Sequence, residues 1–218
     1  MKILVVGKTT DKYLPFDNIR EHFYIDEPHE GENIDSLNPY YCELTGLYYL
    51  WKNCKDDIVG LEHYRRYFVD GKRNLLSEEK IRDILSKDDI ICANHDSIMT
   101  RCSLGNRFIY PACSVGAMQF ELRLILDIME VYHPDKIDRF KKFLREPWHY
   151  QFNMFICKKE LIDEYCEFLF ELLIPISDKM LDKIKPRSIG FLAEILLFTF
   201  WVQEKNLNVY EINPVVLK

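Results

Sequence analysis

The stretch CELTGLYYLWKNCKDDIVGLEHYRRYF, residues 42–68, decides the fold and carries most of the candidate chemistry. Its first half repeats apolar residues at spacings of three and four, which predicts an amphipathic helix over residues 43–53. The apolar run at residues 58–61 predicts a buried strand that leads directly into EHYRRYF, residues 62–68. In open α/β sheets, ligands bind outside the carboxyl ends of the strands. The sequence therefore predicts a ligand site at the exit of this strand.

The rest of the chain alternates predicted strands and helices in the same way, which favours an α/β fold. Strands are predicted at residues 2–6, 89–93 and 209–212, and the second half of residues 148–158 is predicted to be buried and extended. Helices are predicted after a Ser77 cap and at residues 121–132, 160–173 and 189–205, with Pro175 ending the third. Residues 94–116 lack periodicity and are expected to form loops that close over an acceptor. No repeat or linker divides the 218 residues, so we predict a single domain, residues 1–218, with a mixed central sheet.

Composition and missing motifs exclude several classes of protein. The formal charge of −6 argues against a nucleic-acid partner, which needs a basic surface. The seven cysteines form no C-x2-C pair and the six histidines no H-E-x2-H motif, so neither a zinc site nor a disulfide framework is predicted. The eight glycines form neither G-x-G-x2-G nor a P-loop. Kinase, GTPase and NAD-dependent classes are therefore excluded.

Four blocks of the sequence resemble those of a known family. In chain order they are Glu43, Leu44, Thr45, Tyr48, Trp51, Lys52 and Asn53; Gly60 with residues 63–68; Asn153, Met154, Phe155 and Ile156; and residues 190–194. They are similar to the ELT-x2-Y-x2-WKN, G-x-x-HYRRYF, NMFI and GFLAE blocks of bacterial capsular and exopolysaccharide glycosyltransferases, formerly labelled a domain of unknown function. The resemblance implies a GT-A-like, Rossmann-like fold and a nucleotide-sugar donor, a UDP-sugar such as UDP-galactofuranose or a related hexose. It also implies a lipid-linked or oligosaccharide acceptor.

We predict a cytoplasmic chain. The apolar run in MKILVVGKTT, residues 1–10, is too short for a signal peptide. Residues 189–202 are shorter than the roughly 20 residues that span a bilayer and contain Glu194, so a core helix is expected there. A lipid-linked acceptor would leave room for peripheral contact with the inner face of the cell membrane.

His63, Tyr64, Arg65 and Arg66 are the predicted donor- and phosphate-binding residues. One guanidinium group can donate two parallel hydrogen bonds to phosphate oxygens and is always charged, and histidine can donate a hydrogen bond to a phosphate. Many GT-A enzymes hold Mn²⁺ or Mg²⁺ at such a strand exit with an Asp-x-Asp motif, but here the position reads Glu62-His63-Tyr64. This departure puts a divalent metal cofactor in doubt, and we assign no metal ligand. The alternative is a surface ion-pair network in which Glu62 pairs with an arginine.

Five further residues are candidates for binding the donor or the acceptor. Glu43, Thr45 and Asn33 are predicted to contact the ribose or the donor sugar, the alternative being a helix-surface carboxylate and a packing hydroxyl. Asn153 lies in a buried segment and needs hydrogen-bond partners. A similar Phe-Asn element in other GT-A enzymes lies beside the transferred sugar, so the resemblance implies a sugar- or acceptor-binding role for Asn153. His95 follows the strand at residues 89–93 and is a secondary candidate for the acceptor.

Glu194 and Asp96 are the predicted catalytic carboxylates. Glu194 lies in the apolar sequence GFLAEILLF, where an ionised carboxylate is costly unless it has a partner or a task. Burial would raise its pKa toward the range useful for a general base. The alternative is an ordinary salt bridge to Arg187 or a lysine. Asp96, at the exit of another predicted strand, is the secondary candidate.

The resemblance, together with these candidate residues, implies a glycosyltransferase that moves a sugar from a nucleotide donor to a surface polysaccharide. Two other functions stay open: a noncatalytic module that binds carbohydrate or nucleotide, and a structural partner in capsule assembly. The lack of an Asp-x-Asp motif keeps the first of these open.

Overall fold

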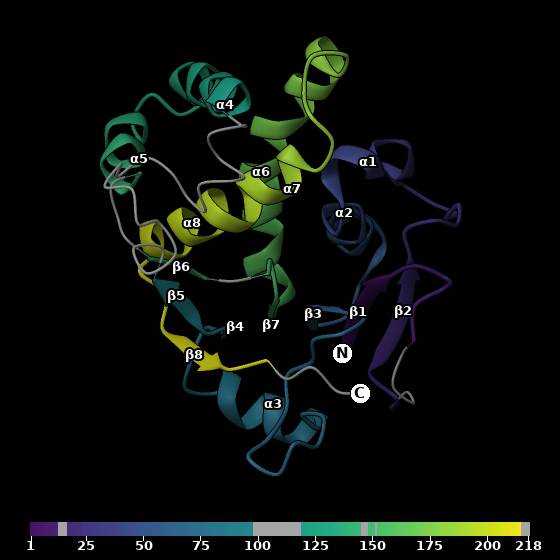
Figure 1. Cartoon of the computed structure of the whole chain (residues 1–218). Helices are drawn as coiled ribbons and strands as arrows, with labels where there is room; N and C mark the ends of the chain where they lie inside the picture. The colour runs from purple at the N-terminus through teal and green to yellow at the C-terminus, as the bar shows by residue number, and fades with distance from the viewer. Residues whose placement is uncertain (13–16, 98–118, 145–147, 151, 215–218) are drawn as a thin grey trace.

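The chain forms a six-stranded mixed β-sheet between two layers of helices (Figure 1). A computed structural model describes residues 1–12, 17–97, 119–144, 148–150 and 152–214. The strands of the sheet, in spatial order, are β2 (Arg20–Tyr24), β1 (Lys2–Gly7), β3 (Ile58–His63), β7 (Phe155–Lys158), β4 (Ile90–Ala93) and β8 (Val209–Ile212). Strand β7 is antiparallel to β3 and β4, and the other neighbouring pairs are parallel. The predicted α/β fold with a mixed central sheet is confirmed.

The helices and a small second sheet complete the described chain. The second sheet pairs β5 (His95–Ser97) with β6 (Trp148–Tyr150). The helices are α1 (Asn38–Tyr41), α2 (Leu44–Asn53), α3 (Glu78–Leu85), α4 (Gln119–Tyr132), α5 (Ile137–Phe143), α6 (Lys159–Met180), α7 (Ser188–Leu192) and α8 (Phe198–Glu204), with a 3₁₀ turn η1 (Asp35–Leu37) and a π-helical turn η3 (Ala193–Leu197).

The alternation of side chains along the strands builds a core on each face of the sheet. Leu4 of β1 belongs to the larger cluster, which includes buried residues of α2, α6 and α8. Its neighbour Ile3 belongs to the smaller cluster with Ile81 and Ile84 of α3. Figure 1 shows α3 alone on one face and α2, α6 and α8 on the other. Ser77 caps α3 as predicted, with its hydroxyl accepting the Lys80 N–H at 3.3 Å.

Strand β2 and helix α6 both differ from the sequence prediction, and the helix predicted over residues 189–205 is divided into α7, η3 and α8. Strand β2 was not predicted, because its sequence REHFY carries charged residues at positions that the structure pairs with β1. Helix α6 continues past Pro175 to Met180, although proline was expected to end it. Leu173 and Ile176 on either side of this proline are buried, so packing outweighs the lost backbone hydrogen bond.

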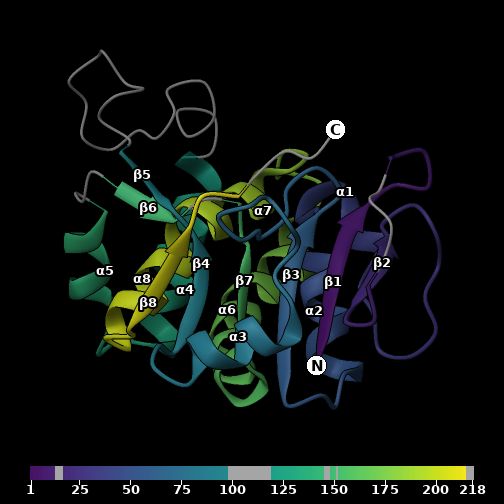
Figure 2. The same cartoon turned by 90° about the horizontal axis from the view of Figure 1, so that it is seen from below.

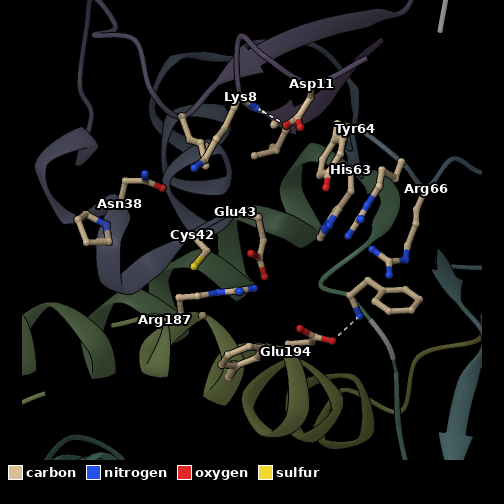
Figure 3. A pocket seen from close by; sticks show the side chains of 18 residues that line it. Lys8, Asp11, Asn38, Cys42, Glu43, His63, Tyr64, Arg66, Arg187 and Glu194 are labelled. Carbon is tan, nitrogen blue, oxygen red and sulfur yellow. Dashed lines mark hydrogen bonds between the residues drawn. The ribbon is translucent and has the colours of Figure 1, made fainter. Parts of the chain in front are cut away.

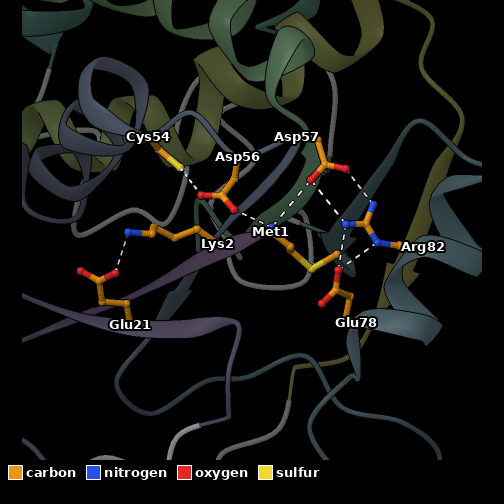
Figure 4. A network of polar contacts seen from close by, with 8 residues as sticks. All are labelled: Met1, Lys2, Glu21, Cys54, Asp56, Asp57, Glu78 and Arg82. Carbon is orange, nitrogen blue, oxygen red and sulfur yellow. Dashed lines mark hydrogen bonds and ion pairs between the residues drawn. The ribbon is translucent and has the colours of Figure 1, made fainter.

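Ion pairs surround the amino end of β1 (Figure 4). The α-amino group of Met1 donates to Asp56 at 2.6 Å, just before β3. Arg82 of α3 pairs with Asp57 at 2.7 Å. These contacts join the amino ends of the two central parallel strands to the helix beneath them, at the end of the sheet opposite to the strand exits.

No helix within the described part of the chain is long and apolar enough to span a membrane. The five cysteines that the structure describes are free, and Cys92, Cys157 and Cys166 are buried. Cys102 and Cys113 lie outside the described residues, as does most of the stretch 94–116 that was predicted to form acceptor loops.

Candidate functional site

A cavity of about 700 Å³ lies at the carboxyl ends of β1 and β3. Figure 2 shows these strand ends on the side of the sheet where α1 and α7 lie. Residues from both strand exits form one wall, and residues of α1, α7 and η3 form the other. Parallel strands place a binding crevice at such an edge. The cavity therefore lies at the strand exit where the sequence predicted a ligand site.

A tight turn after β3 presents the basic residues to the cavity. His63 and Arg66 exchange backbone hydrogen bonds of 3.2 and 2.9 Å, and the Tyr64 N–H donates to the Val6 carbonyl at 2.9 Å. These bonds fix the turn to the end of β1. The Arg65 guanidinium lies 4.8 Å from the centre of the Tyr64 ring, a cation–π contact that orients it. His63, Tyr64, Arg65 and Arg66 all line the cavity.

Glu62 supports this turn from inside the protein. Its carboxylate is fully buried and accepts two hydrogen bonds from Arg20 of β2, at 2.8 and 3.1 Å. It also accepts the Phe68 N–H at 3.0 Å, beyond the turn. Burial raises the pKa of Glu62, and the Arg20 guanidinium partly offsets that shift. The alternative was a surface ion pair of Glu62 with an arginine, but the pair that the structure forms is buried and uses Arg20, which leaves Arg65 and Arg66 to the cavity.

The strand exit does not fit a metal site built on Glu62. Both carboxylate oxygens of Glu62 are occupied by Arg20, and the side chain is absent from the cavity lining. Within the described residues, no group of three His, Cys, Asp or Glu side chains could hold a metal ion. A hard divalent cation needs several oxygen ligands, which this turn does not supply.

Glu194 lies across the cavity in the π-helical turn η3. Its Oε1 accepts the Phe152 N–H at 3.1 Å (Figure 3). Burial, and then the negative charge of Glu43, raise the pKa of Glu194 to about 7, against smaller opposing effects of the Phe152 N–H, Arg66 and Arg187. A carboxylate with this pKa can take up a proton near neutral pH. The π-helical turn places it there, as π turns often do at functional sites.

Arg187 enters the same part of the cavity without forming the salt bridge to Glu194 that was the alternative to a catalytic role. Figure 3 shows Glu43, Arg187 and Glu194 converging there. The structure contains no ion pair between Arg187 and Glu194, both of which it describes. The guanidinium instead lies 4.9 Å from the centre of the Phe191 ring, and the residue adopts a left-handed backbone with φ 65°. Glu194 is therefore not an ordinary buried ion pair.

Glu43 and Asn153 contact each other directly. The Asn153 Nδ2 donates to Glu43 Oε1 at 2.7 Å and, more weakly, to the Gly190 carbonyl at 3.4 Å. Glu43 lines the cavity, whereas Asn153 is 2% exposed and lies behind it. The structure thus places the Asn153 amide against a carboxylate of the site and outside the cavity lining, and its sugar-binding role stays a prediction.

His63 is the most enclosed of the basic candidates. Burial lowers its pKa, and the nearby Arg66 adds to that effect, while Glu43 and the nearby Phe152 backbone oppose it. Its Nε2 atom is buried and has no hydrogen-bond partner. In a neutral imidazole, a nitrogen without a partner can donate or accept one hydrogen bond, and a ligand in the cavity could be its partner.

Besides Asn153, three predicted site residues lie outside the cavity lining, namely Thr45, Asn33 and His95, and the side chain of a further one, Asp96, is not among the described parts of the chain. Thr45 is 1% exposed, and its hydroxyl donates to the Cys42 carbonyl at 2.8 Å, so it has a packing position. Asn33 bonds to His29 and Gly31 within its own loop. His95 pairs with Glu211 at 2.8 Å and lies outside the lining. The backbone of Asp96 pairs in β5, but its side chain lies outside the described structure.

The cavity also contains residues that were not predicted as site residues. Those with polar or aromatic side chains include Lys8 and Asp11 after β1, Asn38 and Cys42 near α1, and Phe152, Arg187 and Phe191. Two signals in the sequence pointed toward them: Lys8 follows the first predicted strand, and Phe152 precedes Asn153. Arg187 had been weighed as a partner for Glu194. Nothing in the sequence showed that α1 and α7 meet at this edge.

Comparison with solved structures identifies the fold. The WbbM bifunctional glycosyltransferase in its apo form superposes with a TM-score of 0.78 at 22% sequence identity. All of this chain is covered, but it spans only 45% of the WbbM chain. No curated protein matches. The family described as "Domain of unknown function (DUF4422)" matches residues 2–206, which is nearly the whole sequence. The chain belongs to this family.

Proposed function

We propose that this chain is a glycosyltransferase that moves a sugar from a nucleotide-sugar donor to a carbohydrate acceptor. One observation carries the proposal: a single cavity at parallel strand exits holds the basic turn of residues 63–66 on one side and the carboxylates Glu43 and Glu194 on the other. Such a transfer needs groups that neutralise a departing diphosphate and a group that accepts the acceptor proton. The likeness of the fold to a glycosyltransferase supports the same proposal.

The donor is proposed to bind at the exits of β1 and β3. Arg65 and Arg66 are the groups that would hold the diphosphate, and the unused Nε2 of His63 would add a hydrogen bond. The loop at Gly7 and Lys8 lies beside this turn and would take the nucleoside. We propose a UDP-sugar, with galactofuranose or a related hexose as the transferred group.

The reaction would proceed at the Glu194 side of the cavity. In the inverting version, the acceptor hydroxyl oxygen bonds to the anomeric carbon, the bond from that carbon to the diphosphate oxygen breaks, and the hydroxyl proton passes to Glu194. Arg66 and Arg65 stabilise the negative charge that develops on the diphosphate. The proposed acceptor is a lipid-linked or oligosaccharide chain, met in the cytoplasm or at the inner face of the membrane.

A donor screen tests this function. The purified chain is incubated with a panel of UDP-sugars, and UDP release is measured beside thermal-shift binding of each donor. Slow release of UDP from one donor, faster with an added acceptor, is the expected result. Binding of UDP-sugars without any release would indicate a noncatalytic binding module. If the chain neither binds a UDP-sugar nor releases UDP from one, the proposal is refuted.

A further inference from the structure

Two consecutive residues with unusual backbone geometry connect the opposite walls of the cavity. Phe152 and Asn153, which precede β7, have φ angles of 72° and 49°. Positive φ is uncommon for residues other than glycine, and for a bulky residue such as phenylalanine it is costly. Backbone strain of this kind clusters at functional sites when the surrounding structure holds it in place. Phe152 and Asn153 contact charged and polar side chains on both walls of the cavity.

Phe152 contacts three groups of the site. Its N–H donates to Glu194 at 3.1 Å, and its backbone lies near enough to the His63 ring to raise the pKa of that imidazole. Its aromatic ring lies 4.2 Å from the Arg66 guanidinium, measured to the ring centre. One residue therefore touches the carboxylate on the η3 wall and both the imidazole and a guanidinium on the β3 wall.

Asn153 contacts a fourth group of the site, the Glu43 carboxylate. Its Nδ2 donates to Glu43 Oε1 at 2.7 Å, a short hydrogen bond to a carboxylate. The side chain is 2% exposed and does not line the cavity. Glycine would adopt a φ of 49° without strain, so the backbone geometry alone does not require asparagine. What asparagine supplies is the amide contact to Glu43.

We propose that Phe152 and Asn153 form the positioning element of the site, and that Asn153 acts on the reaction through Glu43. The inference rests on the proposed function for its catalytic meaning. Phe152 fixes Glu194, His63 and Arg66, and Asn153 fixes Glu43 relative to Glu194. Glu43, released from Asn153, would no longer be held where its charge acts on Glu194.

The test compares Asn153→Gly with Asn206→Gly. Asn206 also has a left-handed backbone, with φ 51°, but it is exposed after α8 and far from the machinery described above. Both substitutions keep a backbone that glycine accepts, and only the first removes the amide from Glu43. Asn153→Gly is expected to lower kcat about tenfold or more, the loss of one hydrogen bond to a charged group, with UDP affinity unchanged. Asn206→Gly should leave both unchanged.

A second measurement does not depend on turnover. The charged groups that act on Glu194 are Glu43, Arg66 and Arg187, and Glu43 raises its pKa. NMR titration of the ¹³C-labelled Glu194 carboxyl should therefore give a lower pKa in Asn153→Gly than in the wild type. Glu43→Gln should lower it as well, and the double variant should show no further fall, because both changes act through one carboxylate.

These readouts separate the possible failures. An unchanged Glu194 titration in Asn153→Gly would overturn the positioning role, whatever the enzyme does. Additive losses of kcat in the Asn153→Gly, Glu43→Gln double variant would also overturn it, since they would mean that Asn153 acts on the substrate directly. A shifted titration in a chain without turnover would refute the proposed function and leave the positioning intact. If Asn153→Gly does not fold, Asn153→Ala removes the same amide while restricting the unfolded chain more than glycine does, and the same loss of kcat is expected.

Discussion

Glu194→Gln should stabilise the protein at pH 8 while it abolishes most of the activity. The glutamine keeps the shape of the side chain, and its carbonyl oxygen can still accept the Phe152 N–H that Glu194 accepts at 3.1 Å. What the substitution removes is a negative charge that burial and Glu43 make unfavourable. A residue retained for catalysis at the cost of stability should show both effects together.

The magnitude follows from the pKa of Glu194. Its value in the folded protein is about 7, raised from 4.5. Between these values the folded state binds more protons than the unfolded state, so the free energy of unfolding falls as pH rises from 4.5 to 7 and is constant above. Each pKa unit corresponds to about 1.4 kcal/mol, which gives a penalty of about 3 kcal/mol at pH 8 as an upper limit. For a chain of this size, that amounts to a rise in Tm of up to roughly 6–12 °C in the variant.

Thermal unfolding and initial rates are measured at pH 5 and pH 8 for the wild type, Glu194→Gln and Glu167→Gln. Glu167 is an exposed glutamate on α6, so its substitution should change neither quantity. Glu194→Gln should gain stability mainly at pH 8 and lose about a hundredfold or more in rate, the scale of general-base catalysis. The wild-type rate should rise with pH through about 7, as the base loses its proton. A variant that is less stable at both pH values and retains its rate would refute the assignment, and Glu194 would then be a structural residue.

Three further predictions concern the turn after β3. The double variant Arg65→Ala, Arg66→Ala should lose roughly 1.5–3 kcal/mol of UDP binding per contact in titration calorimetry; unchanged affinity in a folded variant would move the diphosphate elsewhere. Turnover should persist in EDTA, because Arg20 occupies the Glu62 carboxylate; activity that EDTA abolishes and Mn²⁺ restores would contradict this. Glu62→Ala should lower the free energy of unfolding by up to about 3–5 kcal/mol, since it leaves the buried Arg20 with Asp17 as its remaining carboxylate partner and the Phe68 N–H without an acceptor. Lys2→Ala, in an exposed ion pair, should cost about 1 kcal/mol or less, and equal urea midpoints for the two variants would count against the buried pair.

Local patterns in the sequence predicted most of the fold. Apolar runs gave β1, β3 and β4, and helical periodicity with the Ser77 cap gave α3. Strand β2 escaped prediction because its charged Arg20 is neutralised by Glu62, a residue 42 positions away. Pro175 was misjudged for a similar reason, since buried neighbours on α6 compensate for the break that proline favours. Contacts between distant parts of the chain decided both cases.

The sequence predicted that a ligand site would lie at this strand exit, but it did not predict the contacts among the residues around the cavity. The residues of the strand exit could be named because the strand and the turn are contiguous. Asn153 was expected to face a sugar, and its contact with Glu43, 110 residues away, is a property of the fold alone. Thr45 belongs to the same block as Glu43, yet two residues along a helix point in different directions, and its hydroxyl turns into the backbone. Arg187 reaches the cavity because the Arg187 N–H bonds to the Pro39 carbonyl at 2.8 Å, which joins α7 to α1.

Because Glu194 lies in the π-helical turn Ala193–Leu197, its orientation depends on the number of residues in this segment. A π turn holds one residue more than an α turn. Deleting a single residue within it would let α7, η3 and α8 close into one regular helix, and the two halves would rotate against each other by about 100°. The buried aromatic residues of α8 could keep their packing while Glu194 turned out of the cavity. A one-residue gap in an otherwise similar sequence would therefore mark a protein with the same architecture and no carboxylate at this wall.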